Sequence, residues 1–397
     1  MALTAWQAFK EEALSHDIEE VALRLSGALR KSGGNLVGRC PLGCAKRDGF
    51  IVTRSKRIFL CRPSEVSGDV VKMVEHCLDL DFAAACEWIN GRTRPDRSRD
   101  ESPDEAQVRR ERREKREQER QVREARERKE AEERRHREEE HIADVLERSQ
   151  PIAGTQGEAY LIERGGAPPA RCLKDVLYCP ELDYWGFATE EDARQDVKRW
   201  LAVVPAMIAQ VRDAEGAVVA LHQTFLDPQG RPAKWRPIGF DNPDRKFRGS
   251  PKGGLMRLGP LKDRVAIGEG VETVFGWYAI YACAVGFDDF SLAAAGSIGN
   301  LCGKSTGSMQ HRTATKEGKP VWIPNGEPDL TAPGIILPEY VTEVILLGDG
   351  DSERHATLYR LKAGGKRLAA QGKLVHVHMA PAGADWGDIA KARRKAA

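Results

Sequence analysis

Three carboxylates end apolar runs in the last third of the chain. Glu269 ends RVAIGEG, and Asp349 and Asp351 end VILLGDGD. Residues two apart in an extended backbone point to the same side, so Asp349 and Asp351 can share one ion. Mg²⁺ takes a few carboxylate oxygens and keeps waters that substrate phosphates replace. The three residues therefore indicate a catalytic Mg²⁺ or Mn²⁺ site that supports phosphoryl transfer.

A further acidic pair follows the next strand-like run. Asp385 and Asp388 lie in GADWGDIAK, directly after KLVHVHMAP. They could complete the same metal site or hold a second ion. Each piece alone is also compatible with a solvated turn. The ordered series of a strand with EG, a strand with DxD and a strand with an acidic turn favours the metal site.

Cysteines surround two short strand-like runs near the N-terminus: Cys40, Cys44 and Cys61. Structural zinc needs four Cys or His ligands. Ser64 stands where a fourth cysteine is expected, and His76 and Cys77 on the following helix pattern are candidates for the missing ligand. The alternative is a ribbon without metal, in which the thiols are small buried hydrophobes.

The elements that must position the carboxylates lie in residues 263–397. Apolar runs (DRVAIGEG, YACAVGF, SLAAAG, EVILLGDGD, KLVHVHMAP) alternate with helical segments such as ATLYRLKAGGKRLAAQG. Apolar strands that lead into helices are typical of a parallel α/β sheet between helices. In such sheets the loops at the carboxyl edge open a crevice. The fold would therefore gather the three carboxylates at one edge.

Residues 150–262 are expected to form a mixed α+β region, with a hairpin that turns at AEG in AMIAQVRDAEGAVVALHQTFLD. Lys246, Arg248 and Lys252 stand among glycines that let a backbone approach phosphates closely. One interpretation is a clamp for a nucleotide or for primer and template. The other is a solvated hairpin.

The segment 93–149 is almost free of apolar residues and carries Glu/Arg pairs three or four apart, which stabilise an isolated helix. We expect a long charged helix that acts as a solvated spacer. An RNA- or DNA-binding arm is the alternative, because arginines concentrate between Arg109 and Arg116.

The bulk composition sets outer limits on function. The net charge is +2, so no global field points to nucleic acid and any binding surface must come from local charge. No apolar run approaches the length of a membrane span, and the N-terminus lacks the apolar core of a signal peptide. We therefore expect a cytoplasmic location without a membrane partner. The odd number of cysteines, nine, argues against a disulfide framework.

The run GSIGNLCGKST superficially suggests a phosphate-binding P-loop. That loop needs four residues between its first glycine and the GK pair. Gly299 leaves three residues before Gly303, and Gly296 leaves six. The spacing therefore disfavours a P-loop ATPase.

Residues 263–395 resemble the Toprim domain, the catalytic fold of bacterial primases, of type IA and II topoisomerases and of some nucleases. IGEGVET places Glu269 at the family's glutamate, and LLGDGD supplies its DxD motif. The resemblance implies a magnesium-dependent site that makes or breaks phosphodiesters. Two departures are Thr273, where primases often carry an acidic residue, and DWGD in place of a compact Asp-Pro-Asp motif.

Residues 1–92 resemble the CHC2-type zinc-binding domain of bacterial primases, through DIEEVALRL, GRCP, the strand hairpin and SGDVVKMVEH. In primases this domain contacts template DNA. The resemblance assigns phosphate contacts to basic side chains of the ribbon, among them Arg47, Arg54, Lys56 and Arg57.

Together the two resemblances imply a primase-like nucleotidyltransferase, of the type found in phages, plasmids and mobile elements. Its expected partners are single-stranded DNA template, NTPs and a separate replicative helicase. The alternatives are a Toprim-type nuclease and a non-catalytic replication adaptor derived from a primase. The clustered carboxylates disfavour the adaptor, which has no need of mutually repelling charges.

Overall fold

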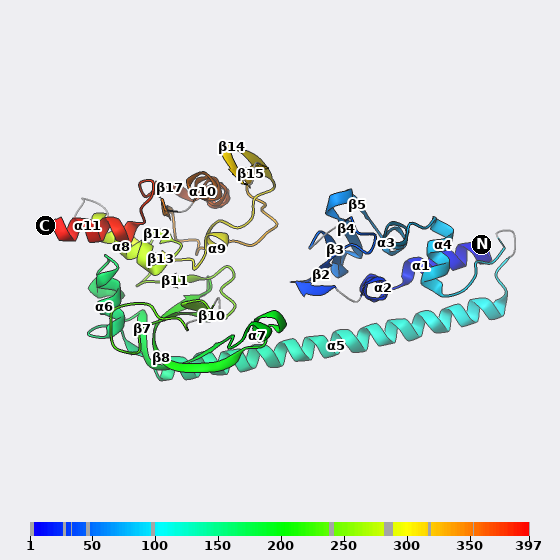
Figure 1. The fold of residues 1–397 in the computed structure, drawn as a ribbon, viewed down its shortest axis with the longest axis horizontal. Coiled ribbons are helices and arrows are strands. Elements are labelled where there is room, and N and C mark those ends of the chain that lie inside the picture. Colours follow the sequence, from blue (N-terminus) through cyan, green and yellow to red (C-terminus); the bar gives the residue numbers. More distant parts are fainter. Residues whose placement is uncertain are drawn as a thin grey trace. The chain divides into compact units, whose positions relative to one another are not determined.

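The computed structural model describes residues 4–26, 29–32, 34–44, 48–96, 100–237, 242–281, 289–316, 319–351 and 353–396. The chain divides into two compact units, Met1–Glu130 and Ala131–Ala397. Helix α5 (Pro103–Glu147) contributes its first part to one unit and its last part to the other. Each unit is described by itself below (Figure 1).

The first unit packs helices on a five-stranded antiparallel sheet in the order β1-β2-β3-β4-β5. Aspartates set the starts of three helices, because Asp17, Asp69 and Asp81 each accept backbone N–H groups of the first turn. The core lies between sheet and helices and includes Phe50 and Phe59. The elements are α1 (Ala5–Ser15), α2 (Ile18–Leu25), β1 (Arg30–Ser32), β2 (Asn35–Gly38), β3 (Phe50–Thr53), η1 (Arg54–Lys56), β4 (Ile58–Cys61), η2 (Arg62–Ser64), β5 (Val66–Gly68), α3 (Val70–Leu78) and α4 (Phe82–Asn90).

The charged segment is helical over the span of α5, as its Glu/Arg spacing predicts. Its first half is not a solvated spacer, however. Arg116 lies 3.1 Å from Glu12 of α1, and Arg123 lies 2.5 Å from Asp17 at the start of α2. Glu127 accepts a hydrogen bond from Arg54 at 2.7 Å. The arginines that suggested an arm thus serve in part as ion-pair partners for the first unit.

The second unit is built on one ten-stranded sheet. Strands β13, β12, β16 and β17 run parallel, and β11 joins β13 antiparallel to β8, β9, β10 and β7. The strands are β6 (Gln150–Pro151), β7 (Val176–Gly186), β8 (Arg199–Arg212), β9 (Val218–Phe225), β10 (Arg245–Gly249), β11 (Leu255–Arg257), β12 (Arg264–Gly268), β13 (Ser291–Ala294), β16 (Glu343–Gly348) and β17 (Leu374–Met379). The expected hairpin at AEG is present as β8 and β9.

Helices cover both faces of the parallel strands, which explains why these strands are apolar throughout. Ala266 and Ile345 belong to the core beside α8 and α11, whereas Val265 and Val344 belong to the core beside α9 and α10. The helices are α6 (Gln156–Glu163), η3 (Ala170–Cys172), α7 (Glu190–Gln195), α8 (Val271–Tyr281), α9 (Ile298–Cys302), α10 (Arg354–Ala369) and α11 (Trp386–Ala396). The expected strand YACAVGF falls almost wholly on residues 282–288, outside the described part of the chain.

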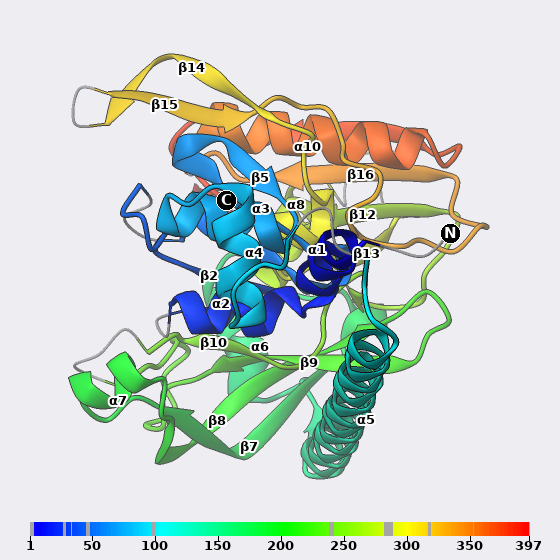
Figure 2. The ribbon, with the colours of Figure 1, turned by 90° about the vertical axis from the view of Figure 1, so that its right-hand side faces the viewer.

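A separate two-stranded hairpin, β14 (Ser308–Lys316) with β15 (Lys319–Pro324), lies beside α10 (Figure 2). The GKST sequence that resembles a P-loop follows α9 and leads into this hairpin. A P-loop instead places GK[ST] at the start of a helix, so the structure agrees with the rejection of that motif. Among the described residues, no helix is long and apolar enough to cross a membrane.

Candidate functional site

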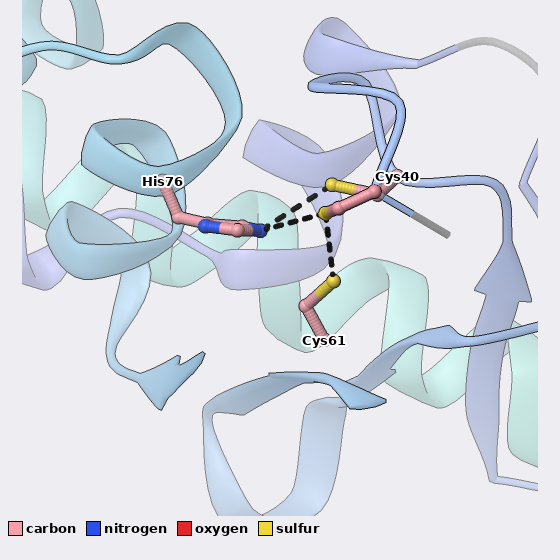
Figure 3. A group of neighbouring side chains, drawn as sticks. Cys40, Cys61 and His76 are labelled. Carbon is pink, nitrogen blue, oxygen red and sulfur yellow. Dashed lines mark hydrogen bonds between the residues drawn. The ribbon is translucent and has the colours of Figure 1, made fainter. Parts of the chain in front are cut away.

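Three cysteines and one histidine meet in the first unit. Cys40 follows β2, Cys44 lies in the next turn, Cys61 ends β4 and His76 lies on α3. His76 Nε2 lies 3.4 Å from both Cys40 Sγ and Cys44 Sγ, and Cys44 Sγ lies 3.2 Å from Cys61 Sγ. Figure 3 shows Cys40, Cys61 and His76 pointing toward one another.

These separations suit a tetrahedral zinc centre. With Zn–S near 2.3 Å and Zn–N near 2.0 Å, a tetrahedron puts two sulfurs about 3.8 Å apart and a sulfur and a nitrogen about 3.5 Å apart. One ligand atom from each of Cys40, Cys44, Cys61 and His76 lies within 4.8 Å of all the others. His76 is therefore the candidate that completes the set of four possible ligands.

The other two candidates for the fourth ligand lie differently. Cys77 is packed in the apolar core of the first unit, and burial raises the pKa of its thiol to about 12. Ser64 lies at the margin of the cluster, with its Oγ 3.9 Å from Cys44 Sγ and 3.5 Å from His76 Nε2. Ser64 thus lies next to the four candidate ligands but is not one of them.

The acidic residues of the second unit lie where parallel strands end. Glu269 directly follows β12, and Asp349 and Asp351 follow the neighbouring strand β16. Gly350 between the aspartates is required by crowding, because a Cβ there would lie 2.0 Å from the carbonyl oxygen of Pro381. The sequence-based expectation that one sheet edge gathers these carboxylates agrees with this arrangement.

Asp349 has an unusual environment for a carboxylate. Its Oδ2 accepts a 2.9 Å hydrogen bond from the hydroxyl of Thr273, but its Oδ1 is buried and has no hydrogen-bond partner among the described residues. Burial raises the pKa of Asp349 to about 6; the Thr273 hydroxyl lowers it in part, and the nearby charges of Asp385 and Asp351 raise it. A buried anionic oxygen without a donor is the kind of group that a metal ion satisfies.

Glu269 and Asp351 are more exposed than Asp349. Partial burial raises the pKa of Glu269, against the opposing charge of Arg245. Within the described ranges, these carboxylates are not among the groups whose ligand atoms all lie within 4.8 Å. Direct ligation of one ion by all three would therefore need a side-chain movement. Mg²⁺ commonly binds one or two carboxylates and keeps several waters, so the residues fit this ion.

The second acidic pair is partly committed to structure. Asp385 accepts a 3.0 Å hydrogen bond from Arg164 on one oxygen and a 2.6 Å bond from the backbone N–H of Asp388 on the other. Asp388 is exposed in the first turn of α11. Asp385 thus caps α11 and adds negative charge beside Asp349.

Glu272, three residues after Glu269, is a buried charged residue that sequence spacing did not single out. Its Oε1 accepts a 2.7 Å hydrogen bond from the Tyr160 hydroxyl and lies 3.5 Å from Lys234 Nζ. Arg245 lies 3.9 Å from its other oxygen. Burial alone would raise the pKa of Glu272, but these two cations and the hydroxyl lower it to about 2. This cluster anchors Arg245 near Glu269.

The basic residues expected to form a clamp do not face the acidic edge together. Lys246 donates to the carbonyl of Trp185 and lies 3.4 Å above the ring of Tyr184. Arg248 lies 3.4 Å from Glu138 of α5. Lys252 is exposed in the loop after β10. Alternate residues of a strand face opposite sides, so β10 directs Arg245 toward Glu272 and its neighbour Lys246 away.

The basic residues of the ribbon are also divided. Arg54 pairs with Glu127, and Arg57 donates to the carbonyls of Leu14 and His16 at the end of α1. Lys56 is exposed. Arg47, which was expected to contact phosphate, lies outside the described residues. Arg54 and Arg57 therefore have structural partners within the first unit.

Comparison with known proteins places the ribbon in a family. Residues 8–102 match the CHC2 zinc finger, and residues 136–258 match a domain of unknown function (DUF7146). The chain is 37% identical over 60 residues to the DNA primases of Rickettsia conorii and Rickettsia felis. That match covers 15% of this chain and only 10% of each relative's length.

Solved structures similar to the chain include the zinc-binding and RNA polymerase domains of Aquifex aeolicus primase, at 16% identity over 98% of this chain and 84% of that one, with a TM-score of 0.33. A DNA primase domain from Pseudomonas aeruginosa is 18% identical over 60% of this chain and 68% of that one, also with a TM-score of 0.33. The family match and the Cys₃His cluster fall on the same residues. The N-terminal part of the chain, residues 8–102, thus matches the CHC2 zinc finger family, whose members include a zinc-binding ribbon of the kind described above.

Proposed function

We propose that this protein is a nucleotidyltransferase that makes short RNA primers on single-stranded DNA by metal-dependent phosphoryl transfer. The observation that carries this proposal is the state of Asp349. Its Oδ1 is buried without a donor, beside other carboxylates at the carboxyl edge of a parallel sheet. The same chain carries a CHC2 ribbon, the kind of domain with which a primase would hold its template.

In this proposal Asp349, Asp351 and Glu269 form the catalytic metal site, and Asp385 contributes charge beside it. Mg²⁺ or Mn²⁺ bound there would stabilise the attacking and leaving oxygens of the transferred phosphoryl group. The chain's own contribution is to hold the carboxylates ready. The Thr273 hydroxyl fixes one oxygen of Asp349 and leaves the other available. The neutral donor at position 273 thus orients Asp349 without adding a further negative charge.

We assign the substrate phosphates to Arg245, assisted by Lys234. Both cations lie within 4 Å of the buried Glu272, and the charge of Arg245 also reaches Glu269. A guanidinium that is already positioned loses little side-chain entropy when it binds a triphosphate. This assignment replaces the expected clamp of Lys246 and Arg248, whose side chains have other partners.

For the ribbon we propose one structural zinc ion, held by Cys40, Cys44, Cys61 and His76. The metal would fix the turn after β2 against β4 and α3, because these elements carry the four ligands. Template phosphates are assigned to exposed basic side chains such as Lys56. A separate replicative helicase would supply the single-stranded template.

The test is primer synthesis by the full chain on single-stranded DNA, with labelled NTPs and Mg²⁺ or Mn²⁺. We expect short RNA products that require template, NTPs and the divalent ion. Shortened template without RNA products would instead identify a Toprim-type nuclease. Absence of both activities, in protein that holds zinc and binds the template, would support the non-catalytic adaptor.

A further inference from the structure

The hairpin of β14 and β15 has an outer face with an unusual composition. Gln310 pairs across the strands with Trp322, and Arg312 follows the buried His311. Gln310, Arg312 and Trp322 are all exposed, and 64% of the Trp322 surface is accessible. Trp322 is the most exposed tryptophan among the described residues, followed by Trp200 at 52% and Trp185 at 45%.

The inner face of the same hairpin packs against the rest of the second unit and holds the hairpin in place. Ile323, next to Trp322, is buried, and β15 packs against α10. His311 is 6% exposed, and its Nε2 lies 3.3 Å from the carboxylate of Glu353. Glu353 caps α10 and stands two residues after Asp351. The base of the hairpin is therefore fixed beside the acidic edge.

His311, Glu353 and His355 also form a group whose ligand atoms lie within 4.8 Å of one another, as a metal site requires. The hydrogen bonds of His311 argue against metal there. Its Nδ1 accepts the backbone N–H groups of Thr313 and Ala314 at 3.1 and 2.7 Å. In a neutral imidazole the proton must then lie on Nε2, which cannot at the same time bind a metal. The histidine serves to anchor the hairpin.

The charge of the hairpin is one-sided. Residues 304–324, the hairpin and the four residues before it, contain four Lys or Arg residues and a single acidic residue, Glu317, in a chain whose total net charge is only +2. Among the described residues, Lys304 and Arg312 are exposed and have no ion-pair partner. The arginines of α5, Arg116 and Arg123, are by contrast paired with Glu12 and Asp17.

An exposed indole with an unpaired cation on the neighbouring strand is a type of surface that binds single-stranded nucleic acid, since a base stacks on the ring and a phosphate pairs with the cation. We infer that the hairpin of β14 and β15 is an arm that binds single-stranded DNA, with a base stacked on Trp322 and a phosphate bound by Arg312. The inference deepens the proposed function, because it assigns this arm to the template beside the acidic edge.

The test measures binding of a fluorescently labelled oligo(dT) to the full chain by anisotropy, without NTPs or divalent ions. Trp322→Ala should weaken binding about fivefold or more, the low end for loss of one stacked base. Trp322→Phe should retain most of the affinity, because it keeps an aromatic face. Trp200→Ala is the matched control, an exposed tryptophan on β8 that should leave affinity unchanged.

Arg312→Ala should lower the slope of log affinity against log salt by about 0.7, the value for one phosphate contact on a single strand. Irradiation with an oligonucleotide that contains 5-iodouracil should attach DNA to the peptide that holds Trp322, even if the ribbon dominates the affinity. Equal affinities of Trp322→Ala and Trp200→Ala, together with no adduct on that peptide, would overturn the inference and leave a protein partner for this face. Both readouts are independent of primer synthesis, so failure of the arm and failure of the proposed activity are distinguishable.

Discussion

Replacement of Asp349 by asparagine should stabilise the metal-free protein while it removes activity. The change keeps the shape of the side chain and an oxygen that accepts from Thr273, but it removes a charge that the fold disfavours. A carboxyl whose pKa rises from 3.8 to about 6 on folding is harder to ionise in the folded chain by roughly 3 kcal/mol. Because Asp349 is only half-buried, solvent screens part of this free-energy difference. We therefore expect Asp349→Asn to raise the free energy of unfolding by about 1–3 kcal/mol.

The sign of the pH dependence follows from the raised pKa. Below pH 3.8 the carboxyl is protonated in both the folded and the unfolded chain and does not change the free energy of unfolding. As pH rises toward 6, the unfolded chain ionises first, and the wild type loses stability relative to Asp349→Asn. The advantage of the variant should therefore be absent near pH 3.5 and complete above pH 7.

The assay is thermal unfolding in EDTA across this pH range. For a unit of this size, about 1–3 kcal/mol corresponds to a rise in Tm of roughly 2–10 °C. Added Mg²⁺ should stabilise the wild type and not the variant, because a ligand stabilises only the state that binds it. Glu215→Gln, an exposed carboxylate in the β8–β9 turn, is the control and should shift neither value. If Asp349→Asn is no more stable than the wild type at pH 7.5, the folded chain does not disfavour the charge of Asp349.

Three further outcomes follow from other contacts. Lys234→Met should destabilise the second unit by about 2–4 kcal/mol in urea unfolding at pH 7, because it leaves Glu272 buried with one cation fewer. An unchanged unfolding midpoint would contradict the ion pair between Lys234 and Glu272. His76→Ala should reduce the zinc content, measured by elemental analysis, from about one ion per chain toward zero. Ser64→Cys should not raise the zinc content, since four ligands are already present. Zinc retained in the His76→Ala variant would contradict this set of ligands. Glu12→Gln should lower the free energy of unfolding of the first unit by about 1–3 kcal/mol, because this buried carboxylate pairs with Arg92 in the loop between α4 and α5 and with Arg116 on α5. Hydrogen exchange of α1 at the wild-type rate would contradict that role.

Much of the parallel sheet could be predicted from sequence, because strands buried on both faces must be apolar at every position. Val265 and Ala266 show this, since they contact different helices from adjacent positions. The carboxylates that end those strands could be placed for the same reason, as the carboxyl ends of parallel strands share an edge.

The fourth ligand of the proposed zinc site could not be chosen from sequence. His76 and Cys77 are neighbours on one helix and point about 100° apart. Which of them faces the cysteines depends on how α3 packs against the ribbon, and that packing is set by residues far away in the chain, such as Phe59, whose ring stacks 5.8 Å from His76.

The cation that we propose for the substrate phosphates was also beyond sequence reasoning. Arg245 and Lys246 are adjacent on β10, and a shift of one residue in register would exchange their faces. The pairing of β10 with β9, in which Arg245 lies opposite Thr224, fixes that register. Glu272 was missed for a related reason, because only the folded structure brings Tyr160 and Lys234 to it.

Side-by-side assays of the wild type and Asp349→Asn show whether Asp349 serves a metal-dependent synthesis of RNA primers. Both proteins are given the same single-stranded template, labelled NTPs and Mn²⁺, after their melting curves have shown that both are folded at the assay temperature. We expect short RNA products from the wild type and at least a hundredfold less from the variant, the scale that corresponds to a loss of about 3 kcal/mol of transition-state stabilisation. Products from the variant at the wild-type rate would show that Asp349 has no part in the synthesis.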